Sequence, residues 1–188
     1  MTSGYDQLEM VADFFNTHDR RTRYEGDPGI EHLTEPSRLV EWLLQHQLIA
    51  KSDDAASAEE LQLACELRDE LRKTIVNNEH DGVGEQVKLE QLTKSFQFGL
   101  MFHENGERLV PLHVNAAKGL AQLLIIVYEL RRTKIWHRIR VCTAKDCQWV
   151  FVDRSRPGTG RWCSMKACGN RAKNKTFRHK HHKSETTI

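Results

Sequence analysis

Four cysteines in the last quarter of the chain have the spacing of a metal site. They form two short pairs, Cys142-x4-Cys147 and Cys163-x4-Cys168, with a gap of fifteen residues between the pairs. Paired cysteines at such spacing are typical of zinc sites, in which four thiolates bind the ion tetrahedrally at about 2.3 Å. Because four thiolates fill the coordination shell, the predicted zinc site stabilises structure and leaves no position open for a substrate.

Three other uses of these thiols stay open at this point. Two disulfides would require an oxidising compartment, whereas Met1–Asp13 lacks the basic and then apolar pattern of a secretory signal. A redox dithiol normally has Cys-x-x-Cys spacing, which neither pair has. An iron–sulfur cluster also takes four thiolates. We favour zinc, and we expect a cytoplasmic protein whose thiols are reduced.

The residues around the thiols predict a small treble-clef-like zinc finger. The first cysteine pair brackets a knuckle. Residues 149–152 and about 160–162 are expected to pair as a hairpin around the Pro-Gly-Thr-Gly turn at 157–160. The second cysteine pair then leads into a helix that begins near Ser164, with Cys168 in its first turn. The positive end of that helix helps to keep the thiolates deprotonated.

Charge is strongly segregated along the chain, although the formal net charge is only +2. Residues 131–188 hold 16 Lys or Arg and three acidic residues, a charge of +13, whereas residues 1–130 hold 12 basic and 23 acidic residues, a charge of −11. Such asymmetry predicts an anionic partner at the basic end, and the acidic part repels nucleic acid. DNA is the favoured partner, and the alternative is a module that binds RNA or docks a protein.

The helix after the last cysteine carries a basic face. Arg and Lys side chains at steps of three and four residues can bind phosphates, and the forked groups of Arg171 and Asn174 can read base edges. Two alternatives are a merely solvated face, and an internal brace in which Arg171 binds knuckle carbonyls and Asp153. The residues that we expect to contact nucleic acid are Arg154, Arg156, Arg161, Asn170, Arg171, Asn174, Lys175 and Arg178.

The spacing of apolar residues predicts a helical domain at 1–135 ahead of a finger at 136–183. The expected fold class is α+β and mainly helical, with one β-hairpin in the first domain. Ser57 and Glu60 have capping-box spacing, and Asn105-Gly106 can form a tight hairpin turn. The expected elements are helices at 5–17, 34–49, 57–76 and 87–94, strands at 96–103 and 108–114, and a longest helix that Asn115 caps.

Several function classes are disfavoured by what the sequence lacks. It contains no nucleophile and base at motif spacing, no glycine-rich phosphate loop and no open metal site, so we expect no enzyme. The best candidate for a membrane segment, Leu120–Tyr128, is too short to cross a bilayer, so no membrane partner is expected. The polar loop at 19–29 contains three arginines, and it is either solvated or the lining of a pocket for a small anionic ligand. The acidic first domain is expected to sense a ligand or to form a homodimer.

The finger region resembles the CGNR zinc-finger family. The family name is spelled out by Cys168-Gly169-Asn170-Arg171. Further residues that carry the resemblance are Trp149, Phe151, Asp153, Ser155, Arg156, Arg161, Trp162, Cys163, Ser164 and Met165.

The first domain resembles the ABATE domain that precedes this finger in bacterial proteins. The similarity rests on residues 14–17 (Phe-Phe-Asn-Thr), on 33–43 with its Trp42-Leu43 end, and on 67–71 (Leu-Arg-Asp-Glu-Leu). Where the family pattern has an Asp shortly before the second helix, this chain has Glu31. The resemblance implies a stress-induced bacterial transcription regulator with a sensing domain at the N-terminus and a DNA-binding zinc finger at the C-terminus.

Overall fold

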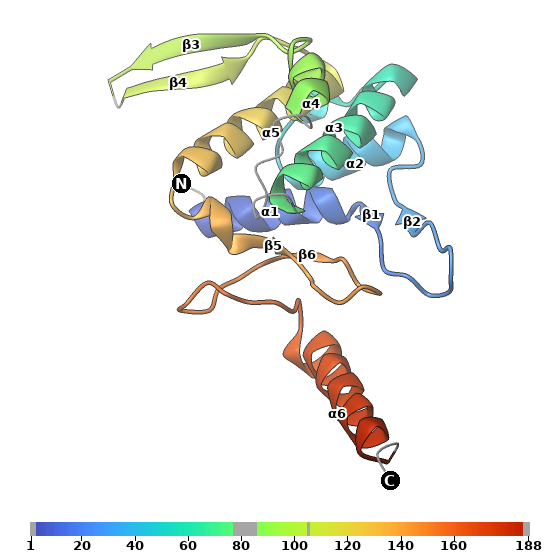
Figure 1. The fold of residues 1–188 in the computed structure, drawn as a ribbon. Helices are drawn as coiled ribbons and strands as arrows, with labels where there is room; N and C mark the ends of the chain where they lie inside the picture. Colours follow the sequence, from blue (N-terminus) through green and yellow to red (C-terminus); the bar gives the residue numbers. More distant parts are fainter. Residues whose placement is uncertain (1–2, 77–85, 105, 186–188) are drawn as a thin grey trace.

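A computed structural model describes residues 3–76, 86–104 and 106–185 of the protein (Figure 1). Its helices are α1 (Gly4–Asn16), α2 (Pro36–Gln45), α3 (Ala58–Val76), α4 (Gln86–Thr93), α5 (Asn115–Arg132) and α6 (Asn170–Glu185), with shorter helical turns η1 (Lys51–Asp53), η4 (Trp136–Arg138) and the π-helical η5 (Met165–Gly169). The strands form three antiparallel pairs, β1 (His18–Asp19) with β2 (Ile30–Glu31), β3 (Phe98–His103) with β4 (Gly106–Pro111), and β5 (Ile139–Val141) with β6 (Val150–Val152). The predicted α+β, mainly helical class is confirmed.

One hydrophobic core holds helices α1, α2, α3 and α5 together. The apolar stripes that the sequence predicts face inward, and Leu8, Phe15, Leu43, Leu67 and Leu120 are fully buried. Burial of a Leu or Phe side chain stabilises a fold by about 1.5–3 kcal/mol, so this cluster is the main source of stability. None of the described helices combines the length and apolar character needed to cross a membrane.

The start of α2 differs from the prediction at its cap. Glu35, not Thr34, occupies the cap position, because Pro36 is the first helical residue and forces its neighbour into an extended conformation, with φ −152°. The helix ends at Gln45 rather than near residue 49. Gln47 adopts a left-handed φ of +56°, and the amide of Leu48 donates to the carbonyl of Leu43 at 2.9 Å, which closes the helix end.

The helix at 58–76 begins as predicted, whereas the prediction for α5 is wrong in two respects. The Ser57 amide donates to Glu60 Oε2 at 2.8 Å and the Glu60 amide to Ser57 Oγ at 3.2 Å, which confirms the capping box. Asn115 does not cap α5: Val114 is the cap residue, and other parts of the chain accept from the free amides, among them Glu60 Oε1 from Ala117 N. α5 has 18 residues and α3 has 19, so α5 is not the longest helix.

The β3–β4 hairpin projects from one side of the body (Figure 1). Its register pairs Phe98 with Pro111 and His103 with Gly106, and Gly106 has the positive φ (+110°) that the turn requires. Asn105, the other residue of the predicted turn, lies outside the described residues, as does the predicted break at 77–84.

The second hairpin, β5–β6, lies against α1 and packs into the same hydrophobic core as the helices. Ile139 and Val150 are buried in the same cluster as the helices. The predicted pairing of 149–152 with 160–162 is wrong, because β6 pairs with β5 in the register Ile139 with Val152 and Val141 with Val150. Residues 160–162 instead run beside the knuckle, where the amide of Thr143 donates to the carbonyl of Arg161 at 2.9 Å.

Candidate metal centre and nucleic-acid interface

The four predicted zinc ligands lie together in the structure. The Sγ atoms of Cys142, Cys147, Cys163 and Cys168 are all within 4.8 Å of one another. Sγ of Cys163 lies 3.5 Å from that of Cys147 and 3.7 Å from that of Cys168. A tetrahedron of four Zn–S bonds of about 2.3 Å has edges of about 3.8 Å, so the thiols stand where a zinc ion needs them. These spacings are far above the roughly 2.05 Å of a disulfide, and all the cysteines are free thiols.

Two backbone turns carry the four thiols. At the first turn, the knuckle, the amide of Cys142 donates to the carbonyl of Trp149 at 2.8 Å and that of Cys147 to the carbonyl of Ala144 at 2.9 Å. At the second turn, η5, Ser164 is the cap, and its Oγ accepts from the amide of Ala167 at 3.3 Å. Cys168 lies in this turn directly before α6, so the predicted helix start near Ser164 is confirmed.

Two of the four thiols resist ionisation, whereas the pKa of Cys142 is lowered because hydrogen bonds from the backbone of Cys163 and Ala144 outweigh its burial. Burial raises the pKa of Cys147 to about 11, and burial together with the adjacent thiols of Cys147 and Cys168 raises the pKa of Cys163 well above its usual range. A bound divalent cation reverses this effect, because it offsets the charge of the thiolates and deprotonates them. The all-sulfur donor set, buried and tetrahedral, fits zinc in a structural site.

The loop between the two cysteine pairs is held by Asp153 and by Arg138, the last residue of η4. Asp153 accepts from the amides of Ser155 at 2.9 Å and Gly160 at 2.6 Å; burial opposes its ionisation, but these bonds keep the pKa of Asp153 below its usual value. Arg138 donates to the carbonyl of Ser155. Gly158 has φ +66°, and a Cβ there would lie 2.9 Å from the Arg138 guanidinium, so the turn requires glycine. The amide of Gly160 therefore binds the Asp153 side chain and not a neighbouring strand.

The residues expected to contact nucleic acid fall into two groups. Three lie on the finger loop: Arg154 is 3.2 Å from Glu9 Oε1 and over the Tyr5 ring, Arg161 is over the Trp162 ring, and Arg156 is exposed. The others lie at the start of α6 or along it. Those whose side chains are exposed are Asn170, Arg171, Asn174, Lys175 and Arg178.

Arg171 differs from the other α6 residues because its guanidinium is engaged within the finger. Its Nη2 lies 3.2 Å from Cys168 Sγ and 3.3 Å from Asp146 Oδ2. Asp146 raises the pKa of Arg171, which stays cationic. The geometry favours the internal brace that the sequence offered as an alternative, with Asp146 as the acidic partner. Asp153, which the sequence suggested for this role, is bound to the loop amides instead.

Two known families match the chain in the predicted order. The CGNR zinc finger family matches residues 138–181, and the ABATE family, described as "Putative stress-induced transcription regulator", matches residues 8–95. The chain therefore contains an N-terminal ABATE domain followed by a CGNR zinc finger. A search of curated proteins gave no match. Neither of the two matching families is a family of enzymes. The division at residues 135 and 136 stays a prediction.

The ABATE domain binds the CGNR finger through contacts that the sequence did not reveal. Asn16 at the end of α1 is buried, and its amide group makes two bonds with Val150: Nδ2 donates to the carbonyl at 2.8 Å and Oδ1 accepts from the amide at 2.9 Å. The amide of Thr22 donates to the carbonyl of Asp146 at 3.1 Å. The Phe-Phe-Asn-Thr segment was a family signal, but nothing in it identified the partner strand.

The arginines of the 19–29 loop are engaged in ion pairs and stacking. Asp19 is buried and binds both Arg21 and Arg23, at 2.7 and 2.8 Å, which holds the pKa of Asp19 far below its usual value. Arg21 also lies over the Trp149 ring, with its Cζ 4.5 Å from the ring centroid, and Arg20 binds Asp69 at 2.9 Å. The loop therefore connects the ABATE domain to the finger.

Glu31 is held by a fully buried arginine at the edge of an open cavity. Arg68 donates to Oε1 and Oε2 of Glu31 at 2.8 and 2.7 Å. The cavity has a volume of about 520 Å³, within the usual range for small-molecule sites, and its lining includes Thr17, Glu31, His32 and Trp42. Binding of a small molecule by the ABATE domain stays a prediction, as does a homodimer.

Proposed function

We propose that the protein is a zinc-dependent DNA-binding transcription regulator in which the CGNR finger presents α6 to the DNA backbone. The observation that carries this proposal is that α6 is strongly positively charged and projects from the rest of the protein. From Lys166 to Ser184 the sequence contains seven Lys or Arg and no acidic residue. Helix α6 packs on the η5 turn and projects from the body (Figure 1).

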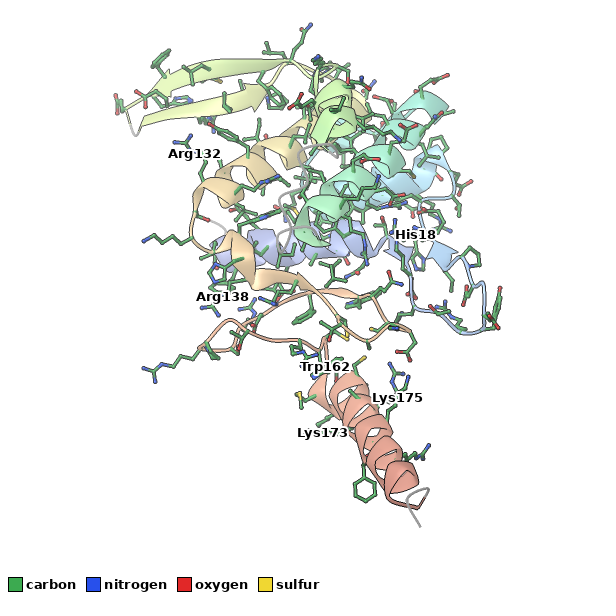
Figure 2. The ribbon with its side chains drawn as sticks, viewed as in Figure 1. His18, Arg132, Arg138, Trp162, Lys173 and Lys175 are labelled. Carbon is green, nitrogen blue, oxygen red and sulfur yellow. The ribbon has the colours of Figure 1, made fainter. Side chains whose placement is uncertain are left out.

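The helix presents cations on more than one side. Lys173 and Lys175 lie on opposite sides of α6 (Figure 2). A helix that is polar all round gains little from packing, and its positive charges repel one another. Contact with phosphates would remove that repulsion and release counterions, which is the main source of affinity in sequence-independent DNA binding.

Different residues have different parts in this proposal. Asn174, Lys175 and Arg178 form the proposed contact face of α6, and Arg156 on the finger loop adds a phosphate contact. Arg171 is bound to Asp146 and Cys168, so its main contribution is to orient the helix. Base reading by Arg171 would require the guanidinium to leave one of these partners.

The proposal also covers the source of the regulator, its cellular location and the signal to which it responds. We infer a bacterial protein that acts in the cytoplasm and answers a stress signal sensed by the ABATE domain. The description of the ABATE family as a stress-induced transcription regulator supports the link to stress. RNA binding or protein docking by the finger is the alternative, and a competition experiment separates the two.

DNA affinity should fall steeply with salt. If four cations contact phosphates, the affinity for a random duplex of about 30 base pairs should drop by about 100-fold between 50 and 200 mM salt. Replacing both Lys175 and Arg178 by Gln should make the slope of log affinity against log salt concentration shallower by about 2. Fluorescence anisotropy titrations at four salt concentrations measure both quantities.

The matched control is Arg38→Gln, an exposed arginine of α2. It should leave the affinity and the salt slope unchanged. An affinity independent of salt would contradict the phosphate mechanism. Preferential binding of a single-stranded RNA of equal length over the duplex would replace DNA by RNA as the partner.

A further inference from the structure

A buried arginine of the ABATE domain reaches the metal centre of the finger. Arg72 on α3 is only 3% exposed. Its Nη2 donates to the carbonyl of Gln148, the residue that follows the ligand Cys147. Its Nη1 has no hydrogen-bond partner within the described residues, and no carboxylate there lies within ion-pair distance of Arg72. Burial, followed by the nearby charge of Arg20, lowers the pKa of Arg72 to about 10.

Of three arginines around the finger, only two form an ion pair with a carboxylate among the described residues. Arg21 binds Asp19, and Arg171 binds Asp146. Arg72 is the most buried of the three and has no such partner in the part of the chain that the structure describes. A buried cation without an ion-pair partner is strongly unfavourable.

The negative charges that act on Arg72 are those of Asp69 and Cys147, which oppose the lowering of its pKa. A zinc–thiolate centre would add to this negative charge. Four thiolates and one Zn²⁺ carry a net charge of −2, and the nearest thiol in sequence to the Arg72 bond is Cys147. The hydrogen bond from Arg72 also holds the backbone of the knuckle in place. Gln148 has a left-handed φ of +52°, which is unusual for a residue other than glycine, and Arg72 holds its carbonyl. Arg72 thereby fixes both the charge balance and the shape of the knuckle.

We propose that Arg72 is a positioning residue and counter-charge of the zinc centre, so that zinc binding locks the finger onto helix α3 of the ABATE domain. Zinc and Arg72 are then linked reciprocally: Arg72 tightens zinc binding, and zinc stabilises the helix that carries Arg72. The proposal concerns the metal centre and the ABATE domain, and it stands whether or not the partner of α6 is DNA.

The first test measures zinc affinity in the full chain by competition with a chromophoric chelator at a fixed pH. Arg72→Met keeps an unbranched side chain but removes the charge and the donors. It should weaken zinc binding by about 10- to 100-fold, the usual effect of losing a residue that supports metal ligands. Arg72→Lys keeps the charge and should lie between Arg72→Met and the wild type. Arg38→Met, on the exposed side of α2, should bind zinc as the wild type does.

The second test needs no variant and applies even if Arg72→Met fails to fold. Hydrogen exchange of the wild-type chain is compared with zinc bound and after chelation. The amides of residues 68–75 in α3 should exchange faster when zinc is removed, while those of α2 should change little. Equal zinc affinities for the wild type and Arg72→Met would overturn the proposal. So would exchange rates in α3 that are the same with zinc bound and after chelation.

Discussion

Replacing Cys147 by Ser is expected to leave the purified protein with less than about a tenth of an equivalent of zinc and to weaken DNA binding by at least about 100-fold. Formation of a structural zinc site contributes about 10–16 kcal/mol in isolated fingers, and three thiolates with one hydroxyl hold the ion far less tightly. Helix α6 rests on the η5 turn that carries Cys168, so loss of the metal removes the support that orients the basic helix. Metal analysis of the purified protein and an anisotropy titration measure the two effects.

The chain offers a matched control for this variant. Cys65 on α3 is half-buried, and burial raises the pKa of its thiol, so it is neither a ligand nor a reactive thiolate. Cys65→Ser should retain close to one equivalent of zinc and bind DNA as the wild type does. Full zinc content in Cys147→Ser would show that this cysteine is not a ligand. Wild-type protein that contains iron and absorbs visible light would replace zinc by an iron–sulfur cluster.

The second large effect is expected at Asn16, where the ABATE domain holds the β5–β6 hairpin. Asn16→Leu keeps the branched shape and the number of heavy atoms of the side chain but removes both bonds to Val150, whose backbone groups would be left buried without partners. Each unsatisfied group costs about 1–3 kcal/mol, so the free energy of unfolding should fall by roughly 2–5 kcal/mol. For a chain of this size that corresponds to a decrease in Tm of roughly 5–15 °C, which differential scanning calorimetry measures.

Asn174→Leu is the control for Asn16→Leu. Asn174 is exposed on α6, so the same change of side chain should leave Tm nearly unaltered. A loss of less than about 1 kcal/mol in Asn16→Leu would mean that water or a backbone shift satisfies the backbone groups of Val150. Asn16 would then not be what holds the hairpin.

The features that the sequence predicted well are those determined by residues close together in the chain. Helix α1 follows from apolar residues at steps of three and four, and the α3 capping box follows from Ser57 and Glu60. The metal centre was also predictable, because each cysteine pair is a short turn and a tetrahedral ion requires the two turns to meet.

The features that the sequence missed depend on contacts between distant segments. Residues 150–152 carry the same apolar pattern whether they pair with 139–141 or with 160–162, and only the bonds of Asp153 and Arg138 to the intervening loop decide between the two. In the same way, a single Asn at the end of a helix and a single Arg in the middle of another give no sign of a partner more than seventy residues away. Burial of these polar side chains is visible only after folding.

The attachment of α6 makes this helix a lever. Its 16 residues span about 24 Å, and η5 lies at one end of that length. A tilt of about 10° at the η5 turn moves the far end of α6 by about 4 Å, more than the length of a hydrogen bond. Small changes where Asn16, Arg21 and Arg72 hold the finger are therefore enlarged along α6 toward its C-terminal end. The geometry allows a subtle event in the ABATE domain to decide whether the basic side chains and a phosphate backbone stay in register.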